Sequence, residues 1–233
     1  METTCHKTAQ GPDDVCGYFR GAPKAQRWDD YLEFAKFLKP EIERIDGFIE
    51  YERFGSQRHK GRLVSLSTRR DKNPLMRWCT RAVHHRVQEN GRLEMFQDYR
   101  LRAGEFSADN KVLEGQTLAQ RRFDQTDMGE AKYVTISEPS PVSGETPASS
   151  DLPRELGLPA TGANGLLDHD VFDGIYVPGQ CLLLASWRDE RAAGAWSPQC
   201  SPQGVLRLRQ VRVIRDDGTR DRREAPQYCE DVR

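Results

Sequence analysis

The stretch "GFIEYERFGSQRHKGRLVSLSTRRDKNPLMRW", residues 47–78, occurs twice in this chain in related form. Its counterpart is "GLLDHDVFDGIYVPGQCLLLASWRDERAAGAW", residues 165–196, and the two align without a gap at a constant offset of 118 residues. The matched pairs include Phe54 with Phe172, Gly61 with Gly179 and Trp78 with Trp196. An ungapped match of glycines, aromatic residues and charges predicts two copies of one structural unit.

The first copy predicts a β-α-β-β-α-β order. Apolar residues recur at helical spacing before the quoted stretch, and short runs bounded by glycine predict strands within it. Asn73 suits the cap of a second helix, and Pro74 suits its first turn. The expected elements are a strand at 14–22, a helix at 27–45 kinked at Pro40, strands at 47–54 and 62–68, a helix at 73–91 and a strand at 94–106. This order is the ferredoxin-like arrangement.

The second copy is eroded, because no long helix follows Trp196. Strands are expected at 131–139 and 205–216, with a short helix near 149–158. Two such sheets packed face to face would bury their uncovered faces. We therefore expect an α+β fold in which two ferredoxin-like repeats form a barrel of the dimeric α+β type within one chain. The expected domains are a site-bearing domain at 12–108, a connector at 109–130, a degenerate domain at 131–216 and a polar tail at 217–233.

The composition of the 233 residues excludes several classes of protein. Charged residues make up 30% of the chain and nearly cancel, leaving a net charge of -1. A nucleic-acid-binding protein usually carries a clustered basic excess, so we expect no such partner. No apolar run approaches the roughly 20 residues of a membrane helix, and the polar N-terminus lacks the apolar segment of a signal peptide. We expect a cytoplasmic protein whose six cysteines, which form no CxxC pair, are reduced.

Three side chains of the second expected helix could take part in chemistry. Trp78 could be a core residue, as its recurrence at Trp196 suggests, or a flat wall for an aromatic ligand, and both can hold at once. His85 is seven residues further on and shares its face, whereas His84 points about 120° away. Histidine suits proton transfer near neutral pH. Two surface histidines are the alternative, and we expect no metal site.

The last strand of the first copy carries alternating charges. Asp98, Arg100 and Arg102 should point to one face of the sheet, and Tyr99 and Leu101 to the other. Buried charges need partners, so one interpretation is a salt bridge inside the barrel. The other interpretation is that Arg100 stabilises an oxyanion.

Aromatic side chains of the first copy could form the walls of a cleft between its sheet and helices. The residues expected to bind substrate are Phe34, Phe37, Tyr51, Phe54 and Tyr99.

Taken together, "IDGFIEYERF", "GRLVSLSTRRD", a W-x5-H pattern and "GRLEMFQDYRLR" resemble the antibiotic biosynthesis monooxygenase (ABM) superfamily. The resemblance covers residues 25–106 well and 165–214 more weakly. It implies a dimeric α+β barrel that oxygenates electron-rich aromatic compounds with O2, without metal or a bound prosthetic group. Trp78, His84, and Arg100 or Arg102 match the family's helix tryptophan, helix histidine and strand arginine. Pro74 stands where the family often has asparagine, which puts the role of that amide in doubt.

The tandem architecture resembles the angucycline B-ring-opening oxygenases of the jadomycin, gilvocarcin and kinamycin pathways. This implies a bacterial, actinomycete-type enzyme that cleaves a carbon–carbon bond of a polycyclic aromatic polyketide by Baeyer–Villiger-type oxidation. Reduced flavin would be a diffusible cosubstrate supplied by a flavin reductase, because the chain has no GxGxxG motif. The alternatives are a cofactor-free anthrone or quinol monooxygenase that gives a quinone, and a non-enzymatic polyketide-binding or cyclase-like protein. A homodimer is compatible with either.

Overall fold

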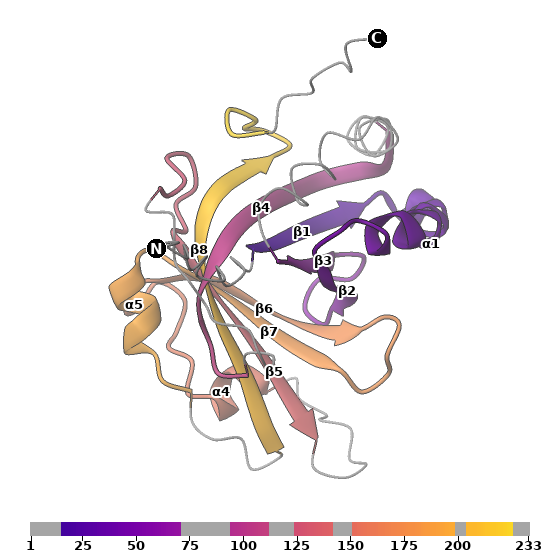
Figure 1. Ribbon diagram of the computed structural model, residues 1–233. Helices are drawn as coiled ribbons and strands as arrows, with labels where there is room; N and C mark the ends of the chain where they lie inside the picture. The colour runs from indigo at the N-terminus through magenta and orange to yellow at the C-terminus, as the bar shows by residue number, and fades with distance from the viewer. Residues whose placement is uncertain (1–14, 71–93, 112–123, 142–150, 199–203, 226–233) are drawn as a thin grey trace, which may run out of the picture.

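The computed structural model describes residues 15–70, 94–111, 124–141, 151–198 and 204–225 (Figure 1). Within these ranges the chain is mostly antiparallel sheet with few helices. The strands are β1 Val15–Pro23, β2 Phe48–Ser56, β3 Leu63–Arg69, β4 Phe96–Asp109, β5 Tyr133–Pro141, β6 Leu166–Gly174, β7 Cys181–Trp187 and β8 Gly204–Gly218. The helices are α1 Trp28–Glu43, which follows the 3-10 turn η1 Ala25–Arg27, α4 Leu152–Glu155 and α5 Glu190–Ala195.

The eight strands close into a barrel in the order β1-β3-β2-β6-β7-β5-β8-β4. We call β1–β4 with α1 the first half, and β5–β8 with α4 and α5 the second half. The halves join where β2 pairs with β6 and where β4 pairs with β8. Arg53 pairs with Ser65 in the first half, and Val171 pairs with Leu183 in the second. These pairs are related by the offset of 118 residues seen in the sequence.

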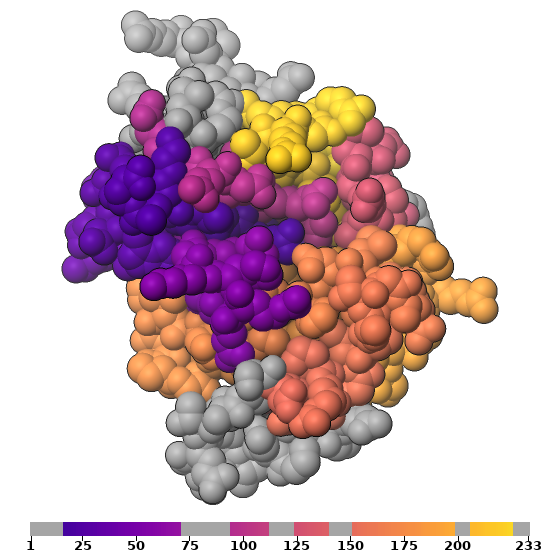
Figure 2. Space-filling view, turned by 180° about the vertical axis from the view of Figure 1, so that it is seen from behind, coloured from indigo at the N-terminus to yellow at the C-terminus, as the bar shows by residue number. Residues whose placement is uncertain are grey.

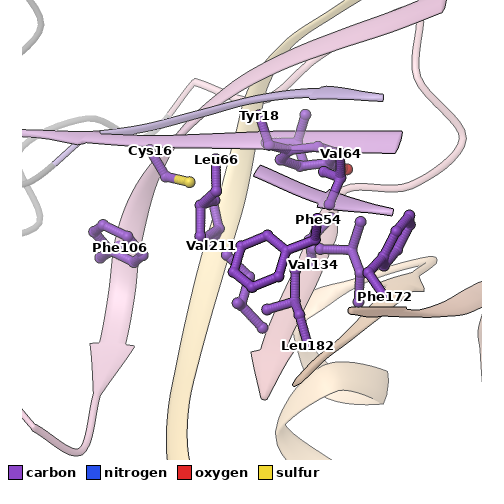
Figure 3. Close-up of a cluster of buried hydrophobic side chains, with 13 residues drawn as sticks. Cys16, Tyr18, Phe54, Val64, Leu66, Phe106, Val134, Phe172, Leu182 and Val211 are labelled. Atoms are coloured by element: carbon purple, nitrogen blue, oxygen red, sulfur yellow. The ribbon is translucent and has the colours of Figure 1, made fainter. Parts of the chain in front are cut away.

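Apolar side chains from both halves fill the inside of the barrel (Figure 3). Alternation along each strand sends every second side chain inward. Tyr18, Phe54 and Phe106 from the first half meet Phe172 and Val211 from the second, and all five are buried. One continuous buried cluster therefore spans both halves, and burial of its apolar area stabilises their association.

The helices cover the outer faces of the two halves on different sides of the barrel (Figure 1). Helix α1 buries Tyr31 and Ala35 against Leu63 of β3. In the second half, Leu152 of α4 and Ala193 of α5 pack in the cluster that contains Trp187. Each half thus has two packed layers, one of strands and one of helix. No helix of the described residues is both long and apolar enough to cross a membrane.

Most of the elements expected from the sequence are confirmed to within two or three residues. Helix α1 runs through Pro40 as one helix, as expected, and ends at Glu43. In the second half the short helix α5 ends at Ala195, before Trp196. The expected helix at 73–91 lies outside the described residues.

Candidate functional site

A row of aromatic rings crosses the outer face of the first half beneath α1. The ring of Tyr31, on α1, lies 5.5 Å from that of Phe96, on β4, measured between centroids. Phe96 lies 5.0 Å from Phe19, on β1, and Phe19 stacks at 5.8 Å against Tyr99. Such edge-to-face and offset contacts are favourable ring geometries. The row presents an apolar patch of ring faces and edges between α1 and the sheet.

Gly21 makes this ring packing possible. A Cβ atom at this position would lie 2.6 Å from Cε1 of Phe19 and 2.8 Å from Cε1 of Phe96. Both distances are shorter than real Cβ contacts, so any larger residue would displace the two rings. The glycine therefore sets how closely the rings approach β1.

At the Tyr31 end of the row lies a buried guanidinium, that of Arg53 on β2. Only 4% of Arg53 is exposed, and its guanidinium carbon lies 4.9 Å from the ring centre of Tyr51 and 5.4 Å from that of Tyr31. Its Nη1 donates a hydrogen bond of 2.7 Å to the hydroxyl of Tyr176, in the turn between β6 and β7. Its Nε is buried and has no hydrogen-bond partner. We call Arg53 with Tyr31, Tyr51 and Tyr176 the Arg53 cluster.

Neutral groups surround this cation. Burial raises the pKa of Tyr31 and of Tyr51, although the nearby Arg53 guanidinium pulls both values down. Both phenols are therefore protonated near neutral pH. Among the residues that the structure describes, no carboxylate pairs with Arg53.

Three other buried arginines, Arg102, Arg209 and Arg212, contrast with Arg53, because each has a carboxylate partner. Arg209 pairs with Glu50 and Glu138 inside the barrel. Arg102 donates from Nε to Asp216 at 2.8 Å. A buried charge normally requires such a partner.

The structure brings some of the expected substrate-binding residues together and separates others. Tyr99 belongs to the aromatic row, Tyr51 to the Arg53 cluster, and Phe34 packs beside Tyr31. Phe54 differs from expectation, because it points into the barrel on the side of β2 away from α1 (Figure 3). Phe37 also differs, because 64% of it is exposed on the outer side of α1.

Arg100 lies in an ion pair on the inner side of the last strand of the first half. Its Nε donates to Oδ1 of Asp216 at 2.6 Å, and Arg102 binds the other oxygen of the same carboxylate. Arg102 also donates to the hydroxyl of Tyr18 at 2.5 Å. The salt-bridge interpretation of these strand charges is confirmed, and the partner is Asp216 of β8 rather than Asp98. The Arg100 guanidinium is therefore bound by Asp216 rather than free to stabilise an oxyanion.

Trp78, His84 and His85 lie outside the described residues, so their positions relative to the aromatic row stay a prediction. Within the described ranges, no group of three His, Cys, Asp or Glu side chains is arranged to hold a metal ion. Burial raises the pKa of the Cys16 thiol to about 12, and that of Cys181 likewise to about 12, so neither is a thiolate near neutral pH.

Sequence reasoning missed Arg53 and Tyr176. A signal for Arg53 was present, because it alternates with Tyr51 along β2 and so shares its face. At the matched position the second copy has Val171, an apolar residue. The contact with Tyr176 could not be read from the sequence, since it joins residues 123 apart across the junction of β2 and β6.

Known proteins were compared with the whole chain. No family model matches it. A protein of Pyricularia oryzae named "Jasmonate monooxygenase ABM" is 38% identical over 215 residues, which cover 90% of this chain and 95% of that protein. Two solved structures also match, a monooxygenase-like protein of Lactobacillus acidophilus and an anthrone oxidase-like protein. The first is 6% identical, and the match covers 88% of this chain and 95% of that protein, with a TM-score of 0.39. The second is 12% identical, and the match covers 93% of this chain and 98% of that protein, with a TM-score of 0.36. Scores this low support no argument about substrate.

Identity of 38% over nearly the whole of both chains shows that this protein is a monooxygenase. It belongs to the ABM family of monooxygenases. The resemblance in residues 25–106 thus led to the right superfamily.

Proposed function

We propose that this monooxygenase inserts one oxygen atom of O2 into a small, largely apolar acid of the jasmonate class, bound against the aromatic row beneath α1. The observation that carries the proposal is the 38% identity, over 90% of the chain, to a protein named for jasmonate oxygenation. The row of Tyr31, Phe96, Phe19 and Tyr99 supports it by offering an apolar surface.

Hydroxylation of such a molecule needs two electrons and two protons in addition to O2. One oxygen atom enters a C–H bond of the substrate, and the other leaves as water. A saturated or alkenyl substrate cannot supply the electrons, so we propose reduced flavin as a diffusible cosubstrate, delivered by a reductase partner. The contribution of the protein is to hold the substrate in one pose and to exclude water.

We further infer that the two halves are copies of one ferredoxin-like unit, which together make in one chain the barrel that other proteins make from two. The common register of β2–β3 and β6–β7, at an offset of 118 residues, supports this inference. The order of strands in the barrel supports it as well, because β1, β2, β3 and β4 have the same neighbours within their half as β5, β6, β7 and β8.

A second candidate is the oxidation of a polycyclic phenol or hydroquinone, ending in a quinone or in angucycline-type cleavage of a carbon–carbon bond. The stacked pair of Phe19 and Tyr99 favours it, because flat ligands stack well on such rings. In this case deprotonated substrate supplies the first electron to O2, and His84 or His85 removes the phenolic proton.

Oxygen uptake separates these candidates. Jasmonate with reduced flavin should give a product heavier by one oxygen atom, with the label of 18O2 incorporated. A polycyclic hydroquinone without flavin should give no uptake above the background rate. Uptake with the hydroquinone alone would favour the second candidate, and no uptake in either mixture would favour a binding protein.

Replacement of both His84 and His85 by alanine tests the role of a base. If a phenol is the substrate, turnover should fall about 10²- to 10⁴-fold, because proton removal is part of the reaction. We expect a fall of less than about tenfold with jasmonate, since no phenolic proton is removed. His169→Ala is the control, as its ring, on β6, contacts Thr161 of the second half and Arg58 of the turn between β2 and β3.

A further inference from the structure

We propose that the Arg53 cluster is the binding site for the carboxylate of an amphipathic acid whose apolar body lies along the aromatic row. The inference rests on the proposed function, and it assigns one residue to one end of the substrate. The ligand belongs to the class of monocarboxylates with an apolar body, and Arg53 is the residue that binds its carboxylate.

The first step is the charge of the cluster. The Arg53 guanidinium is always protonated and is almost completely buried, yet it contacts three phenols and no carboxylate of the described residues. Its Nε, also buried, has no partner. A group of this kind in a native structure calls for an explanation, because an uncompensated buried charge is costly. A bound carboxylate would supply the missing negative charge and accept a hydrogen bond from the unpartnered Nε.

The second step is the position of the cluster. Arg53 contacts the ring of Tyr31, which begins the aromatic row, so the cation lies at one end of a continuous apolar strip. A ligand with a charged head and an apolar body fits this arrangement. A neutral ligand would leave the positive charge of Arg53 uncompensated, and a dianion would bring one more negative charge than Arg53 can compensate.

The third step is access. Tyr176 lies in the turn between β6 and β7 and is 39% exposed, so it separates the guanidinium from solvent. Its hydroxyl oxygen accepts from Nη1, which is the position that one oxygen of a carboxylate would take. In the space-filling view, the purple atoms of β2 and β3 meet the orange atoms of the second half (Figure 2). Displacement of one phenol hydroxyl would therefore open the guanidinium to a ligand.

Two other arginines of the first half are less suited to this role. Arg20 is already paired with Asp168 at 2.7 Å, and Arg100 with Asp216. An acid bound by either would have to displace an existing carboxylate. Arg53 needs to lose only a neutral hydroxyl.

The test is a comparison of two ligands that differ in charge, jasmonic acid and its methyl ester. Dissociation constants are measured by calorimetry without reductant, so that binding is separated from turnover. For the unaltered chain we expect the acid to bind about 10- to 100-fold more tightly than the ester, the range for a hydrogen bond to a charged group. Arg53→Met, which keeps the aliphatic stem, should abolish this preference and leave ester binding within about threefold, because only the charged contact is removed.

Two further variants complete the design. Arg53→Lys keeps the charge without the planar fork and should retain part of the preference. Arg58→Met removes an exposed arginine that bonds His169, outside the cluster, and should leave the preference unchanged. The ratio of the two dissociation constants does not depend on the amount of folded protein, so partial unfolding of a variant does not obscure the result.

The outcomes for the site and for the proposed function are distinct. An acid preference that persists in Arg53→Met, or equal affinity for acid and ester in the unaltered chain, would overturn the site even if jasmonate is oxygenated. An Arg53-dependent preference without oxygenation would leave the site standing and overturn the proposed function. Absence of binding by either ligand would overturn both.

Discussion

On the outer face of the first half, Arg53 of β2 and Arg69 of β3 lie beneath α1, whereas the matched positions of the second half hold Val171 of β6 and Trp187 of β7. All four side chains are buried. The two faces therefore share a backbone register but differ in polarity. This difference indicates which face can bind a charged ligand.

The outer face of the second half is filled by side chains of the chain itself. The indole nitrogen of Trp187 donates to the hydroxyl of Thr135 at 3.0 Å, and its ring lies 5.6 Å from that of Trp196. The cluster also contains Leu183 and Leu156, which directly follows α4. A face filled in this way gains stability from burial, and its buried cation Arg212, paired in register with Tyr133, already has a carboxylate partner in Glu105 at 2.7 Å.

The largest expected effect comes from placing a charge in the apolar face. Val171→Arg would bury a guanidinium among apolar side chains without a partner, and we expect the free energy of unfolding to fall by about 3–5 kcal/mol. Arg53→Met should cost less than about 2 kcal/mol, because no described carboxylate loses its partner. Urea denaturation of both variants measures the difference. Equal losses would show that the two faces do not differ in the way proposed.

A smaller effect is expected at Gly21. Gly21→Ala should lower the free energy of unfolding by about 1–3 kcal/mol and weaken ligand binding, because the added methyl group displaces Phe19 and Phe96. Gly55→Ala is the matched control on β2, where the nearest atom to the added Cβ would be 3.9 Å away. Thermal unfolding and calorimetry check both. If the two variants behave alike, close packing of the rings against β1 is not what fixes the row.

The smallest effect separates two phenylalanines of α1. Phe34→Ala should destabilise the chain by about 1 kcal/mol and reduce activity, since its ring packs beside Tyr31. Phe37→Ala should change stability by less than about 0.5 kcal/mol and leave activity unchanged, because the ring is exposed. A marked loss of activity in Phe37→Ala would restore its expected place in a binding wall.

The sequence predicts the strands well because alternating apolar residues and bounding glycines are local signals, and because the same pattern recurs at an offset of 118 residues. It fails where a side chain is placed by a distant partner. Asp216 binds Arg100 across 116 positions of sequence, and no local pattern indicates this pairing. The error at Phe54 was avoidable, because alternation along β2 puts it on the face opposite Tyr51. The buried stripe of α1, which runs through Tyr31, Ala35 and Leu38, likewise leaves Phe37 outside.

The closed barrel formed by a single chain has a consequence for how its faces can evolve. In a barrel assembled from two identical chains, one codon change alters both outer faces, so a costly buried cation would appear twice in every molecule. Here the codons for Arg53 and Val171 are separate. Selection can therefore keep one face polar for a ligand while the other accumulates apolar substitutions that offset the instability of the first.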